Sequence, residues 1–337
     1  MQMACVAVAA WGRPVDASRS RAFDRERGAT SVALPSSSAC VLNRRTLLTG
    51  AATMALAHGA FPALANTPLP GAEDAAQAAK RKINLSGRQR MLSQRMAKSA
   101  AMVRLGVEPE RRLAMMAAAH GLFDRTLTGL MHGDASQGLT VETNPRVIES
   151  LKVVDGLWLG YGAAIQLSVT SGAVDDAQMA TITKLNVPVL VNMDNSVKEF
   201  EMAYGDRSIS LGLAIAINVS CRRRMLSQKM SKEACLYALA IDPDAARAAL
   251  GETVRLFDLS LTALTDGLPT VAIINPPTTD IAAKLQEVQA LWAAFKPRMD
   301  AAALLGASSI TQIEEIALAN DPLLSTMNEA VFLYEAA

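Results

Sequence analysis

The stretch INLSGRQRMLSQRMAK at residues 83–98 recurs as INVSCRRRMLSQKMSK at residues 217–232, 134 positions further along and without a gap. An internal repeat of this kind indicates that the chain holds two copies of one structural unit. The same offset relates the Leu-Phe-Asp sequence at 122–124 to the Leu-Phe-Asp sequence at 256–258. Features that both copies share are therefore features that both copies have retained since they diverged.

Single residues at the same offset extend the repeat over most of the chain. The matched residues are Gly71 with Gly205, Pro109 with Pro243, Gly133 with Gly267, Trp158 with Trp292, Asn186 with Asn320, Pro188 with Pro322 and Met193 with Met327. A unit of about 130 residues is an ordinary size for a domain. We therefore predict one repeat over residues 71–204 and a second over residues 205–337.

The composition of each copy predicts helices. Ala, Leu, Met, Gln, Glu, Lys and Arg dominate, and aromatic residues are scarce, which favours helix over strand. Glycines at helix ends and prolines at helix starts divide the first copy into segments at about 73–105, 109–131, 145–170 and 175–204. Four long helices with short connections make an up-down-up-down bundle. The sequence thus predicts an all-α protein of two tandem four-helix bundles.

The even number of helices predicts how the two copies are joined. The fourth helix of the first copy ends where its first helix began, so a short turn at Gly205 would start the second copy in the same direction. The two motif helices would then run parallel, related by a pseudo-twofold axis as in a symmetric dimer. Gly205 followed by Asp206 and Ser208 is typical of a helix stop and a new cap. The alternative is one unbroken helix through Gly205, with the bundles end to end.

The first 65 residues are predicted to be an export signal. Two arginines at 44–45 precede an apolar run at 47–63, which is shorter than the ~20 residues of a bilayer-spanning helix. The run ends in Ala-Leu-Ala at 63–65, a pattern that signal peptidase accepts. We interpret 1–65 as a twin-arginine signal with a long N-terminal extension, cleaved after Ala65. The alternative is an uncleaved membrane anchor, and a start codon assigned too early would explain the long extension.

Net charge, hydropathy and cysteine content limit the possible classes of partner, membrane insertion and disulfide bonding. The leader contains seven Arg and three acidic residues, so its removal takes the formal net charge from +1 to −3, which does not fit nucleic-acid binding. The best apolar stretch after the leader, at 211–219, is too short to span a membrane. Cys221 and Cys235 lie on one predicted helix, roughly 21 Å apart at ~1.5 Å per residue. They cannot bridge each other, and we expect buried free thiols, the alternative being an intermolecular bridge.

The motif helix has two organised faces. Leu85, Leu92 and Met96 form the stripe that we assign to the bundle core. The nearly opposite face carries Arg90, Gln94 and Lys98, and copy two repeats this spacing as Arg224, Gln228 and Lys232. If the motif helices pack through that face, Arg90 and Arg224 meet across the axis, and a small planar or tetrahedral oxyanion would satisfy both guanidiniums. The alternative is that these arginines extend along a solvated helix face.

The motif Ile-Asn-x-x-Gly-x-x-Arg-Met-x-Ser-x-Arg resembles the signature of the PilJ/NarX-type periplasmic sensor domain of type IV pili chemotaxis transducers and nitrate/nitrite sensor kinases. The resemblance covers both repeats. It implies a four-helix bundle that dimerises, with the anion held between the two motif helices by the arginine before the methionine. That arginine corresponds to Arg90 and Arg224, and the second motif arginine corresponds to Arg95 and, with a substitution, to Lys229.

These observations predict a soluble periplasmic sensory protein that binds an anion of the nitrate or nitrite class without a cofactor or metal. The predicted ligand-binding residues are Arg90, Arg224, Arg95, Lys229, Gln94 and Gln228, supported by Arg88, Arg222, Asn84, Asn218, Lys98 and Lys232. Lys229 cannot form the two-pronged contact of an arginine, and Cys221 replaces Gly87, so we expect unequal half-sites. Family transducers carry membrane helices and a cytoplasmic output module. Because neither is evident here, we expect a membrane-bound sensor or transducer as partner.

The sequence leaves two alternative functions to consider. The first is a scaffold in which the motif helices only hold the pseudo-dimer together, while the outer helices bind a sensor kinase, pilus component or envelope protein. The second is an enzyme, which the sequence does not favour. His120 and His132 are not repeated in copy two, and neither a phosphate-binding glycine loop nor a nucleophile elbow is present.

Overall fold

The computed structural model describes residues 72–306 and 309–337, so the predicted export signal at 1–65 lies outside the described residues. The described part contains eight α-helices and no strand. The first four are α2 (Ala72–Arg104), α3 (Pro109–His132), α4 (Pro145–Ser171) and α5 (Asp176–Tyr204). The second four are α6 (Leu211–Ala238), α7 (Pro243–Asp266), α8 (Thr279–Leu305) and α9 (Ile310–Ala336). Two short 3-10 helices, η2 (Ala135–Gln137) and η3 (Pro269–Val271), precede α4 and α8.

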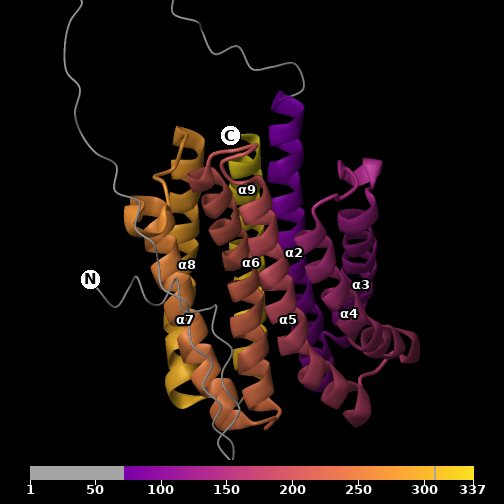
Figure 1. Ribbon diagram of the computed structural model, residues 1–337. Helices are drawn as coiled ribbons and strands as arrows, with labels where there is room; N and C mark the ends of the chain where they lie inside the picture. The colour runs from indigo at the N-terminus through magenta and orange to yellow at the C-terminus, as the bar shows by residue number, and fades with distance from the viewer. Residues whose placement is uncertain (1–71, 307–308) are drawn as a thin grey trace, which may run out of the picture. The chain divides into compact units, whose positions relative to one another are not determined.

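Each set of four helices packs as one bundle. In the first, α2 packs against α3 and α5, and α4 packs against the same two helices; α6, α7, α8 and α9 repeat these pairings. The motif helices α2 and α6 lie in the middle, with α3 and α4 beside α2 and with α7 and α8 beside α6 (Figure 1). The predicted tandem four-helix bundles are confirmed.

Local sequence chemistry explains where the helices begin and end. The Asn144 side chain accepts hydrogen bonds from the backbone N–H groups of Arg146 and Val147 at the start of α4. At the start of α5, Asp175 and Gln178 cap each other's backbone reciprocally. Gly133, after α3, has φ = 82°, a conformation that glycine adopts at little cost. The predicted segments consequently match the observed helices to within one or two residues at each end.

A turn joins the two bundles, as predicted, but its chemistry differs from the expectation. Gly205 has φ = −62°, and Asp206 instead takes the left-handed conformation, with φ = 59°. Ser210, and not Ser208, caps α6 by accepting from the N–H of Leu213. The Asp206 carboxylate accepts from the N–H of Leu211 at 3.0 Å, and this local hydrogen bond offsets part of the cost of the unusual backbone.

The repeated aromatic residues link the second and third helices of each bundle. The indole N–H of Trp158 in α4 donates to Asp124 in α3 at 2.9 Å, and Trp292 in α8 donates to Asp258 in α7 at the same distance. Phe123 lies against the Trp158 ring with a centroid separation of 4.2 Å, and Phe257 lies equally close to Trp292. The repeated Leu-Phe-Asp and Leu-Trp sequences thus encode one packing unit used twice.

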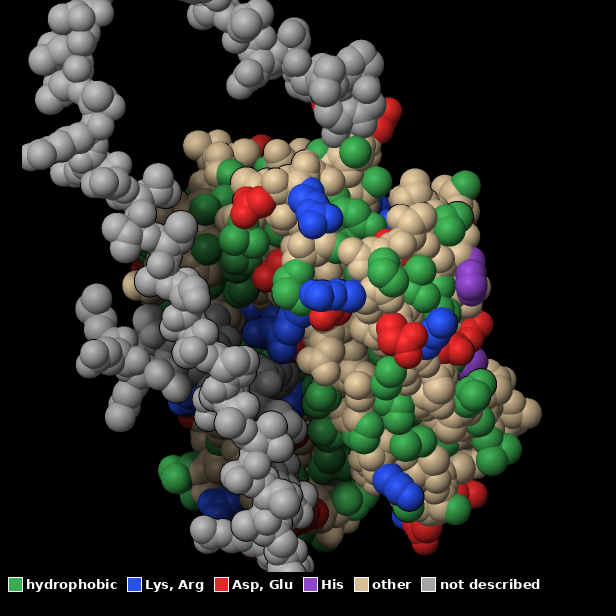
Figure 2. Space-filling model, viewed as in Figure 1, with side chains coloured by type: hydrophobic (Ala, Val, Ile, Leu, Met, Phe, Trp, Pro, Cys, Tyr) green, Lys and Arg blue, Asp and Glu red, His purple; other side chains and the backbone are tan. Residues whose placement is uncertain are grey.

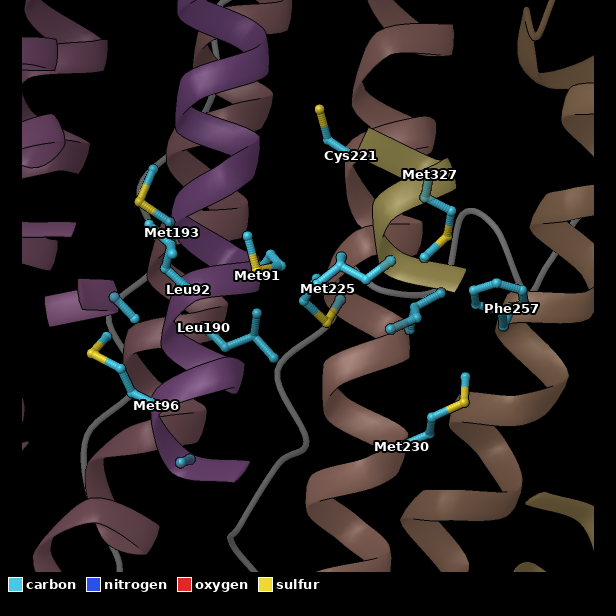
Figure 3. Close-up of a cluster of buried hydrophobic side chains, with 14 of the residues drawn as sticks. Met91, Leu92, Met96, Leu190, Met193, Cys221, Met225, Met230, Phe257 and Met327 are labelled. Atoms are coloured by element: carbon cyan, nitrogen blue, oxygen red, sulfur yellow. The ribbon is translucent and has the colours of Figure 1, made fainter. Parts of the chain in front are cut away.

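The core contains many methionines. Figure 3 shows Leu92, Met96 and Met193 on the side of the first bundle, and Met230, Met327 and Phe257 on the side of the second. Met91 and Met225, equivalent residues of the two copies, point into the space between α2 and α6. Apolar packing is therefore continuous across the contact between the bundles.

Charged side chains of both signs lie close together on the face seen in Figure 2. Among the described residues, some exposed charged side chains form pairs one helical turn apart, such as Arg255 with Glu252 and Lys296 with Asp300. Exposed pairs of this kind contribute little to stability. In the described part of the chain, no helix combines the length and the apolar character needed to cross a lipid bilayer.

Candidate functional site

The two motif helices pack directly against each other. α2 contacts α6 more extensively than it contacts any other helix. A Cβ atom added to Gly87 of α2 would lie 2.5 Å from the Cβ atom of Cys221 in α6, so the backbones approach closely at this point. Gly87 and Cys221 are equivalent residues of the two copies. Further toward the C-terminal ends of both helices, Lys232 of α6 also contacts Gln94 of α2. The two contacts together show that α2 and α6 run parallel about a pseudo-twofold axis, as predicted. We call the contact between α2 and α6 the seam.

Arg90 is buried at the seam with a carboxylate partner. Its guanidinium forms an ion pair with Asp194 of α5 and donates to the Asn218 side chain of α6 at 2.8 Å. Asp194 also lies 3.1 Å from Lys198 and 3.2 Å from Arg222. Burial by itself would raise the pKa of Asp194, but the charges of Arg222, Arg90 and Lys198 hold that pKa well below its usual range. The charge of Arg90 is therefore compensated within the chain.

Arg224, the equivalent arginine of copy two, has only neutral partners. It is fully buried and donates to the side-chain oxygen of Asn84 at 2.8 Å and to that of Asn328 at 3.2 Å. Asn328 occupies the position that Asp194 holds in copy one. Among the described residues, Arg224 forms no ion pair. Each guanidinium thus donates to the asparagine of the opposite helix, and only the Arg90 half contains a carboxylate partner.

Two buried lysines continue the seam toward the other end of the helices. Lys232 donates to Gln94 at 3.0 Å and to Asn186 at 2.9 Å. Lys98 donates to Asn320 at 3.3 Å, and Asn320 also accepts from Gln228 at 2.6 Å. Burial lowers the pKa of Lys98 to about 7 and that of Lys232 to about 8. Neither lysine forms an ion pair within the described ranges, so amide oxygens alone hold these cations.

The remaining predicted site residues mostly serve their own bundles. Arg88 donates to Thr126 of α3 at 3.1 Å and to Gln137 of η2 at 3.2 Å. Burial lowers the pKa of Arg88 to about 10, and the charge of Arg224 adds to that effect. Lys229 forms an ion pair with Glu233 and donates to Thr253 of α7 at 2.7 Å. Arg95 is half-buried; burial lowers its pKa, and the charge of Asp321 in α9 acts in the opposite direction. Arg88, Arg95, Arg222 and Lys229 form an outer row beside the seam, and of these only Arg222 joins the Arg90 half, through Asp194.

The sequence did not identify the fourth-helix residues that complete the seam. These are Asp194 and Asn186 in α5, Asn328 and Asn320 in α9, and Glu335, which accepts from the Asn84 amide. The repeat pairs Asn186 with Asn320, but the sequence alone assigns neither residue a contact. The available signal was the offset of 134, which relates Asn186 to Asn320 and Asp194 to Asn328.

The fold and the polar seam define the class: a tandem helical-bundle module with an internal pseudo-dimer. The family model described as type IV pili methyl-accepting chemotaxis transducer N-term matches residues 74–183 and again residues 208–317. The chain belongs to this family and carries two copies of its domain. Comparison with curated proteins returned no match, and comparison with solved structures returned none.

The Gly87–Cys221 contact gives a first prediction. Gly87→Ala is expected to lower the free energy of unfolding by about 1–3 kcal/mol, because the added methyl group overlaps Cys221 and forces α2 and α6 apart. Adding Cys221→Gly should restore most of the loss, since it removes the atoms that clash. Urea unfolding of the two single variants and the double variant measures this coupling. Equal losses for Gly87→Ala with and without Cys221→Gly would contradict the close approach of the helices.

Proposed function

We propose that this chain is a non-catalytic periplasmic sensory protein that binds a small oxyanion of the nitrate or nitrite class at the seam and passes its state to a membrane-bound transducer. Membership of the transducer family supports the sensory role. The predicted export signal supports the periplasmic location. The observation that carries anion binding is the buried guanidinium of Arg224, which has asparagine partners where Arg90 has Asp194.

An anion at this half of the seam would supply the missing negative charge. A buried cation without a counter-charge is costly, and a bidentate oxyanion satisfies a guanidinium through two charge-assisted hydrogen bonds. Lys98 and Lys232, held by amides, add positive potential further along the seam. Arg90 shapes the other half but already has a carboxylate. The site we propose is therefore unequal, with Arg224 as its principal ligand.

Burial of Arg224 links binding to a change of conformation. The side chain is 0% exposed, so an anion reaches it only when α2 and α6 separate or slide against each other. Binding energy that favours the displaced helices would change the spacing of the two bundles. That change is the signal that we propose a membrane partner detects.

Anion titration of the full chain tests this function. We expect nitrate or nitrite to raise the thermal unfolding midpoint of the wild type, with sulfate and phosphate as comparison anions. Arg224→Gln should abolish the shift, whereas Arg146→Gln, at an exposed position of α4, should keep it. No stabilisation of the wild type by any of the four anions, or an undiminished shift in Arg224→Gln, would sink the proposal.

A scaffold role is the second candidate, and one observation favours it. Arg90, Arg224 and Lys232 all hydrogen-bond within the chain, so the seam polar groups can hold the pseudo-dimer together without a ligand. In that case nitrate leaves the midpoint unchanged, while Arg224→Gln destabilises the protein in every salt. Recovery of the same envelope partner by the wild type and by Arg224→Gln would further support this second role.

A further inference from the structure

A second unusual arginine lies inside the second bundle, on the other side of α6 from the seam. Arg223 is 1% exposed, and its guanidinium carbon lies 4.5 Å from the centre of the Phe257 ring in α7. None of its three guanidinium nitrogens has a hydrogen-bond partner among the described residues. An arginine offers five N–H donors, and buried donors of this kind are nearly always paired.

A small cavity lies beside this guanidinium. Its volume is about 10 Å³, and Arg223 and Ser220 are its polar lining residues. The remaining walls are apolar side chains from α7, α8 and α9, including Leu264, Val288 and Met327. The Ser220 hydroxyl also lacks a hydrogen-bond partner within the described ranges. The hydroxyl of Tyr334 in α9 also lacks a partner there, and Tyr334 raises the pKa of Arg223 against the effect of burial. Arg223 and Ser220 therefore both bring unsatisfied donors to this buried cavity.

The first bundle shows that the fold does not require these groups. Gln89 occupies the position of Arg223, and Phe200 occupies the position of Tyr334. The Gln89 amide donates to the carbonyl of Phe123 at 2.7 Å, and the hydroxyl of Ser86, equivalent to Ser220, donates to the carbonyl of Ile83 at 3.1 Å. Copy two thus has a charge and a phenol hydroxyl that copy one lacks, at a position where a neutral side chain packs well.

Electrostatics favours a negative occupant of this cavity. Burial lowers the pKa of Arg223 to about 9, while Tyr334 and Asp258 act in the opposite direction, so the guanidinium remains charged at neutral pH. Asp258 is exposed and accepts from Trp292, and it forms no ion pair with Arg223 in the described part of the chain. A buried guanidinium without a counter-ion is costly. A neutral water would satisfy N–H donors but would not balance the charge.

We propose that this cavity binds one monatomic anion of chloride size, held by the guanidinium of Arg223 and the hydroxyl of Ser220. A cavity of about 10 Å³ admits one particle near the size of a water molecule. The unbranched, flexible side chain of Met327 can yield to a slightly larger ion. Nitrate and phosphate, which have several heavy atoms, do not fit. The site is therefore separate from the seam and selects for a different size of anion.

Unfolding of the full chain in chloride or bromide tests the proposal, with gluconate at the same ionic strength as the reference salt. We expect saturating halide to raise the thermal unfolding midpoint of the wild type by several degrees relative to gluconate. Arg223→Gln, which recreates Gln89 of copy one, should lose this halide response. Arg224→Gln should keep it, so failure at this cavity is distinguishable from failure at the seam. Equal midpoints in halide and gluconate, or an unchanged halide response in Arg223→Gln, would overturn the proposal in favour of a bound water.

Bromide diffraction provides a measurement that does not depend on a variant folding. Crystals of the wild-type chain grown with bromide should show an anomalous peak within hydrogen-bond distance of the Arg223 guanidinium. Ser220→Ala, which keeps the charge, should weaken the peak without abolishing it. A cavity without anomalous signal in the wild type would show that it holds no halide, and this would overturn the proposal.

Discussion

Asp194→Ala is expected to lower the free energy of unfolding by about 3–5 kcal/mol, because it leaves the buried Arg90 guanidinium without a counter-charge. Asp194 faces Arg90, Arg222 and Lys198, and Arg90 is 0% exposed, so water cannot take the place of the lost carboxylate. The three positive charges would then repel one another across α2, α5 and α6. Urea unfolding of the full chain at neutral pH measures the loss.

The equivalent position of copy two supplies a matched control for this prediction. Asn328→Ala removes one neutral hydrogen bond to Arg224 and should cost only about 1 kcal/mol. Asp194→Asn should fall between the two, since it recreates the arrangement that copy two tolerates. If Asp194→Ala costs no more than Asn328→Ala, Asp194 does not compensate Arg90.

The same carboxylate gives a pH dependence with a defined sign. The pKa of Asp194 is lower in the folded protein than in the unfolded chain, where an aspartate titrates at about 4. The stabilisation is therefore fully present above about pH 4 and is lost as the pH falls toward the folded pKa. In Asp194→Asn, the free energy of unfolding should fall less steeply as the pH drops below about 4. An equal loss of stability below about pH 4 in the wild type and the variant would contradict the strong pairing of Asp194.

Local patterns were sufficient to predict the helices and the parallel seam. Glycine and proline mark the helix ends within a few residues, and the even helix count fixes the direction of α6. The burial of Arg90, Gln94 and Lys98 follows from a polar face that both copies keep beside small residues. Such signals depend on neighbours within one helix, which the sequence shows directly.

The partners of those polar groups were not predictable by the same reasoning. Asp194 lies 104 positions from Arg90, and its equivalent in copy two is an asparagine, so comparison of the copies hides its charge. The substitutions at Lys229 and Cys221 predict that the two half-sites are unequal. In the structure the two halves of the seam differ in charge for another reason, because Asp194 of the first copy is replaced by Asn328 in the second. Outer-row side chains such as Arg88 reach other helices of their own bundle. Residue spacing along one helix does not predict which of these helices they contact.

Lys98→Met is expected to stabilise the protein by about 1–4 kcal/mol at pH 6, because it removes a buried charge held only by an amide. Burial lowers the pKa of Lys98 from 10.5 to about 7; Asp321 opposes this shift, and Arg95 and Arg112 add to it. Between pH 7 and 10.5 the unfolded chain binds more protons at this lysine than the folded protein does. Stability of the wild type should consequently rise with pH across that window, and the advantage of Lys98→Met should shrink.

The pH course of this difference also tests whether the seam binds an anion. Lys152→Met, at an exposed position of α4, should show neither the stabilisation nor the pH dependence and serves as the control. A Lys98→Met variant less stable than the wild type at pH 6 would contradict the uncompensated charge. An anion bound near Lys98 would favour its charged form and raise its pKa. With saturating nitrate, the stability advantage of Lys98→Met should therefore decrease at pH 6, and the pH range over which this advantage changes should move to higher pH. The reason is that the ligand then supplies a negative charge near Lys98, whereas the described part of the seam supplies one only to Arg90.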